Sequence, residues 1–264
     1  MIFREVHIAM KQSCFTAVLL AVCLLLSGCG NSGTVESGTV SALQTVQQPV
    51  SGTVTLPEVP AANSAQDETR TADPVPAEQA EPDFVPGFRS GGVYENRYFG
   101  LCCTLDDYWT FLSDAELLKL AGLSIDELDD ESLKEILGNS DVIYDMYASA
   151  DDGLETVNVV IEKLSLLNST IYDEKSYADA AVEGLEASTA AMGVSDAVIE
   201  SGTEFFAGAM HPIIRISGTL DGTDVGFFEK VICLKRGSYV CCITCSSCFE
   251  DITDTISAAF SAIE

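Results

Sequence analysis

Residues 30–90 offer no face that a folded core could use, which confines folding to the rest of the chain. Ser, Gly, Thr, Pro, Ala, Glu and Gln dominate there, and apolar residues show no periodicity. Such a segment cannot bury enough apolar surface to offset the entropy that ordering costs. We therefore expect a disordered tether over residues 29–90 and one folded domain over residues 91–264, a length that suits a single core.

A short apolar run precedes the tether. Arg4 and Lys11 are followed by an apolar stretch from Cys14 to Leu26, and small residues then lead to Cys29. This order of basic, apolar and small residues is typical of a secretory signal. The run is too short to cross a bilayer, which needs ~20 residues. Residues 1–28 are therefore predicted to be a signal peptide.

The end of this run, Leu26-Ser27-Gly28-Cys29, resembles the lipobox of bacterial lipoproteins at every position. The resemblance implies a diacylglyceryl group on the Cys29 sulfur and cleavage just before Cys29. Two acyl chains are physically sensible, because a single chain binds a membrane only marginally. The alternatives are an ordinary secretory signal or an uncleaved helix that happens to end in cysteine. We expect a protein at the bacterial cell membrane, lipid-anchored through Cys29 and facing outside the cytoplasm.

The first half of the domain predicts two short helices and a hairpin. Capping-box patterns begin at Ser113 and at Ser124, with helices ending near Gly122 and Gly138. Strand-like runs are expected within 93–105, at 142–148 and at 156–164, the last two joined by a turn at 151–153.

The second half predicts a long helix, a meander and a final helix. Strand-like runs occupy 194–199, 204–207, 213–220, 225–234 and 238–244, and turns between the last three predict an antiparallel meander. The long helix carries one stripe at helical spacing, formed by Tyr177, Ala180, Ala181, Gly184, Leu185, Ser188, Ala191 and Met192. The final helix should share a face among Ile252, Ile256, Ala259, Phe260 and Ile263. The fold class is therefore α+β, with a meander sheet sandwiched by helices.

One group of residues resembles a known family. The residues that carry the resemblance are Tyr94, Asn96, Phe99, Gly100, Leu105, Trp109 and Phe111. This part of the chain resembles the opening of PsbP-like domains. The resemblance covers residues 93–263 and implies a PsbP-like sandwich. The helical insert at 113–137 departs from the compact form of that fold. Many PsbP-like domains, including the DcrB-like group, are tethered or secreted bacterial proteins without an assigned activity, so the resemblance brings no functional residue.

The domain is strongly acidic. Residues 91–264 contain nine basic and 32 acidic residues, a balance that repels nucleic acid and anionic lipid headgroups. It could attract cationic partners or loosely held divalent ions, although a solvated surface explains it more simply. One acidic cluster lacks the spacing of a calcium loop and lies where a helix begins, which favours carboxylates; its members are Asp126, Glu127, Asp129, Asp130 and Glu131.

Seven cysteines remain outside the signal peptide and the lipidation site. They are Cys102, Cys103, Cys233, Cys241, Cys242, Cys245 and Cys248. Residues 239–244 are predicted to form a strand, whose neighbours point to opposite faces, so Cys241, Cys242 and Cys245 cannot converge on one metal. We interpret them as small buried apolar residues and expect no metal. A disulfide between Cys102 or Cys103 and a cysteine of a neighbouring strand stays open.

No catalytic signature is present in the sequence. His211 is the only histidine after the signal peptide, and the G-x-S-x-G, G-x-x-x-x-G-K-[ST] and G-x-G-x-x-G patterns are missing. No cofactor is therefore expected. Trp109 is predicted to be a core anchor, with a ligand-stacking platform as the alternative. Paired carboxylates are too numerous to be informative.

Two functions are compatible with these features of the sequence. The favoured one is a non-catalytic lipoprotein that binds an envelope protein or helps to assemble an envelope complex. The alternative is an envelope hydrolase that acts on wall or glycan material through paired carboxylates.

The anchor is directly testable. Cys29→Ala removes the sulfur that would carry the diacylglyceryl group, so acylation and maturation at this position should both be lost. Fatty-acid labelling in cells and the mass of the mature chain measure this. A variant that is acylated and cleaved as before would show the lipobox interpretation to be wrong.

Overall fold

The computed structural model describes residues 83–121 and 141–263. The predicted signal peptide, Cys29 and most of the tether lie outside these residues. So do the second capping-box helix and the acidic cluster that begins it. None of the helices in the described part is long and apolar enough to cross a membrane.

Seven strands form the main sheet. They are β4 (Trp109–Phe111), β5 (Val142–Ala150), β6 (Glu155–Lys163), β7 (Val194–Phe206), β8 (Ala209–Leu220), β9 (Gly226–Arg236) and β10 (Tyr239–Cys248). Their order is β4-β5-β6-β10-β9-β8-β7, and every neighbouring pair is antiparallel. The predicted meander of the last three strands is confirmed. The runs at 194–199 and 204–207, predicted as separate strands, are parts of one long β7 that pairs with β8.

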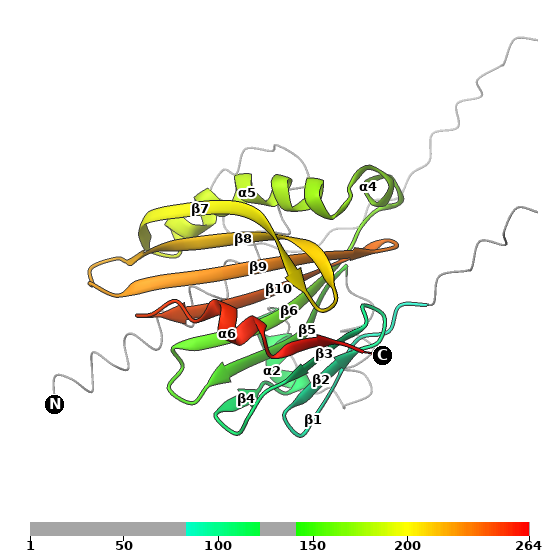
Figure 1. The fold of residues 1–264 in the computed structure, drawn as a ribbon, viewed down its shortest axis with the longest axis horizontal. Helices are drawn as coiled ribbons and strands as arrows, with labels where there is room; N and C mark the ends of the chain where they lie inside the picture. The colour runs from blue at the N-terminus through cyan, green and yellow to red at the C-terminus, as the bar shows by residue number, and fades with distance from the viewer. Residues whose placement is uncertain (1–82, 122–140, 264) are drawn as a thin grey trace, which may run out of the picture. The chain divides into compact units, whose positions relative to one another are not determined.

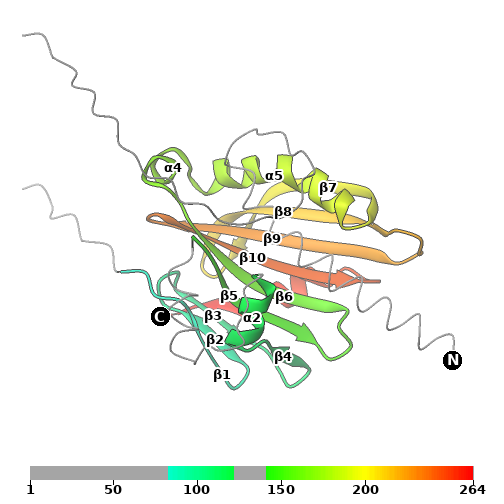
Figure 2. The same cartoon turned by 180° about the vertical axis from the view of Figure 1, so that it is seen from behind.

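Four short strands form a second sheet, in the order β1-β2-β3-β11. Its strands are β1 (Phe88–Ser90), β2 (Val93–Asn96), β3 (Leu101–Thr104) and β11 (Phe260–Ala262). The helices are α2 (Asp114–Leu120), α4 (Leu166–Ile171), α5 (Glu174–Ala191) and α6 (Thr253–Ser257). Figures 1 and 2 show α5 lying along β7 and β8, and the small sheet gathered at the other end of the main sheet.

The two faces of the main sheet are covered by different layers. On one face, α5 packs through Tyr177, Ala181 and Leu185 onto β8, β9 and β10, and Leu117 of α2 joins a neighbouring cluster. On the opposite face, Tyr94 and Leu101 of the small sheet pack against residues of β5, β6 and β10. The α+β class is therefore right, and among the described residues helices pack on both faces of the sheet, α5 on one and α6 on the other. A second sheet, with α6 beside it, covers one face.

The predicted start of the first helix is confirmed, and the long predicted helix is present. Ser113 caps α2 with the predicted capping box. The long helix runs from Glu174, and Asp173 caps it. Its buried residues are Tyr177, Ala178, Ala181, Leu185, Ser188 and Thr189, whereas Ala191, predicted on the buried stripe, is exposed.

Two boundary predictions differ from the structure. The helix expected to reach Ile263 ends at Ser257, and Phe260 and its successors pair with β3 instead. The open edge of β3 explains this, because strand pairing satisfies its backbone groups. At the other end, residues 88–90, predicted as part of the tether, form β1 and pair with β2, so the folded part begins before residue 91.

A buried lysine holds the end of the chain on the main sheet. Lys230 of β9 has no exposed side-chain surface, and its Nζ donates to Glu204 Oε1 of β7 at 2.7 Å and to Asp254 Oδ1 of α6 at 2.8 Å. Arg215 of β8 donates to the same two carboxylates, at 2.8 and 2.6 Å. The two cations lower the pKa of Asp254 below its usual value. This network joins β7, β8, β9 and α6.

Neutralising a carboxylate of this network should lower the free energy of unfolding more than neutralising a carboxylate of an exposed ion pair. Glu204→Gln leaves Lys230 buried with a weaker partner, so the free energy of unfolding should fall by about 1.5–3 kcal/mol, the contribution of hydrogen bonds to charged groups. Asp179→Asn is the matched control. It breaks the exposed pair with Lys175, which should cost at most ~0.5 kcal/mol. Urea unfolding measures both, and equal losses would contradict the role given to Lys230.

Candidate functional site

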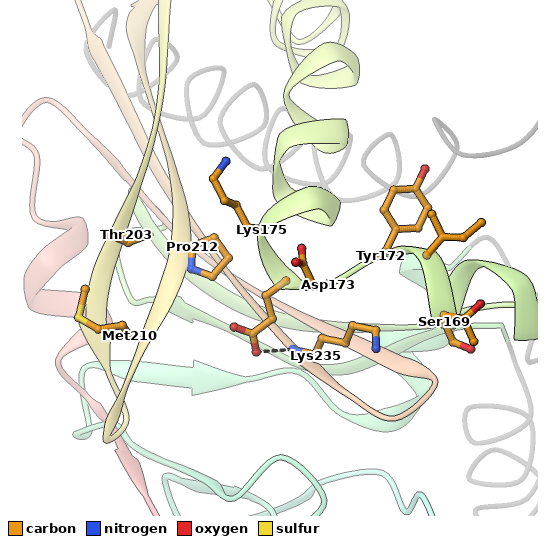
Figure 3. A pocket seen from close by; sticks show the side chains of 11 residues that line it. Ser169, Tyr172, Asp173, Lys175, Thr203, Met210, Pro212 and Lys235 are labelled. Atoms are coloured by element: carbon orange, nitrogen blue, oxygen red, sulfur yellow. Dashed lines mark hydrogen bonds between the residues drawn. The ribbon is translucent and has the colours of Figure 1, made fainter.

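An open groove lies where α4 and α5 meet the hairpin of β7 and β8. Its volume is about 740 Å³. The apolar part of its lining comes from Ile171, Tyr172, Met210 and Pro212. Figure 3 shows Thr203, Pro212 and Met210 on the hairpin facing Lys175, Asp173 and Tyr172 across the groove. The groove therefore combines segments some 40 residues apart in sequence, which the sequence patterns did not bring together.

Exposed apolar side chains lie on the helix α4 and on the β7–β8 hairpin, which both line this groove. On α4, the exposed fractions of Leu166, Leu167 and Ile171 are 85%, 67% and 62%, and this helix buries none of its residues. On the hairpin, Phe205 is 68% exposed and Met210 is 59% exposed. Single exposed apolar residues are ordinary, but a group of them around one depression is typical of an interaction surface.

The polar groups below the groove have structural partners. Glu174, the first residue of α5, accepts the Lys235 backbone N–H at 2.8 Å through Oε1, drawn as the dashed line in Figure 3. Its Oε2 lies 3.0 Å from Nδ1 of His211. His211, expected at the start of a strand, is the third residue of β8. Its ring therefore helps to fix the start of α5 against the sheet.

A buried aspartate ties the N-terminal segment to the main sheet. Asp145 lies at a bulge in β5 and accepts from Gly87 N at 2.7 Å, Tyr94 Oη at 2.5 Å and Asn96 Nδ2 at 2.8 Å. Burial raises its pKa above the usual value, although these hydrogen bonds act in the opposite direction. Arg89 bonds the Asp145 carbonyl and Asp114. These bonds thus fix the segment around residue 87 on the main sheet.

Trp109 lies half-buried at the edge of the main core and lines a second pocket. This pocket, of about 420 Å³, also contains Tyr108 and Glu155. Burial and a hydrogen bond with Asp152 raise the pKa of Glu155 to about 7. The pocket is therefore lined by two aromatic rings and by a carboxyl group whose pKa is raised.

The cysteines lie on opposite faces of the sheet, as the strand geometry predicted. Cys241 and Cys245 of β10 belong to the core beneath the small sheet, whereas Cys242 packs under α5 and its Sγ lies 4.0 Å from that of Cys233. Cys103 also belongs to the core beneath the small sheet, so it shares a cluster with Cys241 and Cys245. No disulfide links cysteines within residues 83–121 and 141–263, and no group of three or more His, Cys, Asp or Glu there could hold a metal.

Sequence reasoning missed a row of buried polar side chains on the same face of the main sheet as α5. Asn158 of β6 lies opposite Thr244 of β10, and Thr156 and Glu229 lie opposite Ser246 in the next row. All five are at most 3% exposed. Glu229 Oε2 accepts from Ser246 at 3.1 Å, but its Oε1 and the side-chain polar atoms of Asn158, Thr156 and Thr244 have no hydrogen-bond partner among the described residues. On a strand, Asn and Thr suggest a solvated face, so only packing could reveal this row.

In comparisons with known proteins, no family model and no curated protein matches the chain. Among solved structures, the fold is similar to cyanobacterial PsbP (CyanoP) from Synechocystis, with a TM-score of 0.38 and 12% identity, covering 66% of this chain and 98% of that one. It is also similar to LpqN, described as involved in cell envelope biogenesis of Mycobacterium tuberculosis, with a TM-score of 0.34 and 10% identity, covering 62% and 83%. At these values neither match carries a conclusion about function.

Glu229 predicts a pH-dependent stability. Burial raises its pKa from 4.5 to about 7, so the folded chain binds this proton more tightly than the unfolded chain. The protonated Glu229 therefore contributes to the free energy of unfolding, and this contribution is fully present below pH ~4.5 and is lost as the pH rises through ~7. Glu229→Gln keeps a neutral side chain at every pH, so the wild type should lose up to about 3 kcal/mol relative to the variant over this interval.

Thermal or urea unfolding between pH 4 and pH 8 measures the difference. Glu183→Gln, on the exposed side of α5, controls for the loss of one negative charge. A constant difference between wild type and Glu229→Gln across this range would contradict the prediction.

Proposed function

We propose that this protein is a non-catalytic binding or accessory module of the bacterial cell envelope, held at the membrane through acylated Cys29. In this proposal the folded part belongs to the PsbP-like group, including its DcrB-like members. It engages another envelope protein at the groove between α4, α5 and the hairpin of β7 and β8. The observation that carries the proposal is the exposed apolar rim of that groove.

The physical argument concerns surface that water would otherwise cover. Each large apolar side chain that a partner buries contributes about 1.5–3 kcal/mol relative to full exposure. Leu167, Ile171 and Met210 could all contribute from one side of a contact. The open shape of the groove favours a macromolecule, because small-molecule sites enclose most of their ligand.

Site-directed photocrosslinking in cells tests this proposal. A photoreactive phenylalanine analogue is placed at Leu167 of α4 or at Met210 of β8, two elements that line the groove, and at Tyr108 as the control. Tyr108 is 43% exposed and lines the other pocket. We expect the two groove positions to capture the same envelope protein and the control position not to capture it.

A second part of the crosslinking experiment introduces a charge into the proposed contact. Leu167→Asp would bury a carboxylate without a partner, so capture from Met210 should fall by about tenfold or more. Capture of the same products from all three positions, or recovery of lipid and wall polymer alone, would contradict protein binding at this groove.

A hydrolase remains the alternative, favoured by one specific observation. The raised pKa of Glu155 and the half-buried Trp109 occur in one pocket, a combination suited to an acid beside a sugar ring. Release of soluble fragments from purified cell wall by the wild type, lost in Glu155→Gln, would support it. No release by the wild type would favour the binding function.

A further inference from the structure

The main sheet ends in one long strand and one very short strand. β7 has 13 residues and β4 has three, and they occupy the two edges. Among the described residues, no strand pairs with the outer side of β7. A bulge interrupts its pairing with β8 between Ser195 and Val198, where Asp196 has a φ of 52°. From Ile199 to Phe206 the pairing is continuous, which leaves a regular edge of eight residues.

This edge has few of the usual protections. Natural edge strands commonly carry Lys or Pro, which discourage pairing with another strand. β7 contains neither residue. Its regular part includes small side chains at Ser201, Gly202 and Thr203, all exposed, which leave its backbone accessible to an added strand.

The two faces of β7 differ in chemistry. On the α5 side lie Ile199, which packs against the cluster under α5, Thr203, which lines the groove, and Phe205, which pairs with Met210. On the opposite side lie the carboxylates of Glu200 and Glu204. Glu204 is already bound to Arg215 and Lys230, whereas Glu200 is exposed. A strand beside β7 would therefore meet apolar groups on one face and a carboxylate on the other.

We propose that β7 accepts an extended, basic segment of an envelope protein as an additional antiparallel or parallel strand. In the added segment, apolar residues alternate with Lys or Arg, so that the apolar side chains of the segment reach the groove and its basic side chains reach Glu200. This inference rests on the proposed function and names the chemistry of the partner. Backbone hydrogen bonds supply the attachment, and the alternation supplies the specificity.

Charge favours this partner over a second copy of the chain. The 91–264 segment carries 32 acidic and nine basic residues, so two copies repel each other. β7 itself has three acidic residues and no basic one. If two β7 strands paired with each other, the carboxylates of both copies would lie close together and repel each other. A basic segment removes that repulsion and gains from the field of the whole domain.

Synthetic peptides test strand addition on the purified full chain. The first probe is an eight-residue peptide that alternates Val and Lys, capped at both ends. A second has the same sequence but with every backbone nitrogen methylated, and a third alternates Val and Glu. We expect binding of the first peptide only, with protection of the amides of residues 199–206 against hydrogen exchange. N-methylation keeps the side chains and their charge, and it replaces the backbone donors on both edges of the peptide by methyl groups that block strand pairing.

Two charge reversals test the position. Glu200→Lys should weaken binding of the Val–Lys peptide about threefold to fivefold, because it removes one exposed ion pair and adds a repulsion. Glu250→Lys changes the net charge equally, but Glu250 is exposed beyond the end of β10, so it should leave binding within about twofold. Circular dichroism and hydrogen exchange of the free variants confirm that β7 is intact in both.

The outcomes separate the two proposals. Equal binding of the methylated peptide, equal loss in both charge variants, or protection away from residues 199–206 would overturn strand addition. So would concentration-dependent dimerisation of the full chain that protects β7, since the occupant would then be a second copy. In each of these cases, position-specific capture from Leu167 and Met210 would still support protein binding at the groove.

Discussion

The central strand of the main sheet, β10, and its neighbour β9 are covered on both faces, and this constraint governs the rest of the structure. α5 covers one face and the small sheet covers the other. Nine of the ten residues of β10 are therefore buried. A strand in this position must be apolar, small or internally paired along its whole length. That requirement explains why β10 contains small buried cysteines, why Lys230 is bound to two carboxylates, and why burial raises the pKa of Glu229.

The polar groups within this core have different consequences. Lys230 has no access to water, and its two carboxylate partners come from the strand at the sheet edge and from the last helix. It therefore joins the edge strand β7 to the short helix α6 near the end of the described chain. Glu229 and its neighbours lie on the opposite face of the sheet, where burial favours the neutral form of the carboxyl group. The first arrangement holds elements together, whereas the second makes stability depend on protonation.

The proposed binding surface depends on the same network. Glu204 belongs to β7, and its bonds to Lys230 and Arg215 hold that strand from the face opposite the groove. The outer edge of β7 is then presented in a fixed position beside the apolar rim of the groove. An acidic domain with such an edge favours a basic, extended partner, and a lipid anchor with a long tether would allow the domain to reach one.

Local patterns determined much of this protein. The capping boxes of α2 and α5, the hairpin at residues 151–153 and the meander of β8, β9 and β10 all follow from turn chemistry and periodicity, which act within a few residues. The opposite-face placement of the cysteines follows from strand geometry alone. The signal peptide, the lipobox and the tether are likewise interpretations of local sequence, and they lie outside the described residues.

Tertiary structure decided the rest, because it depends on contacts between distant segments. Residues 260–262 have a helical apolar pattern but pair with β3, since an open strand edge outweighs a weak local preference. Phe88–Ser90 follows a proline-rich stretch yet joins the small sheet, where Asp145 fixes the segment beside it. The groove combines helices and strands far apart in the chain, the buried polar row combines three strands, and β7 is an edge because no other described strand pairs with its outer side. No periodicity within one segment could predict them, because their chemistry exists only where those segments meet.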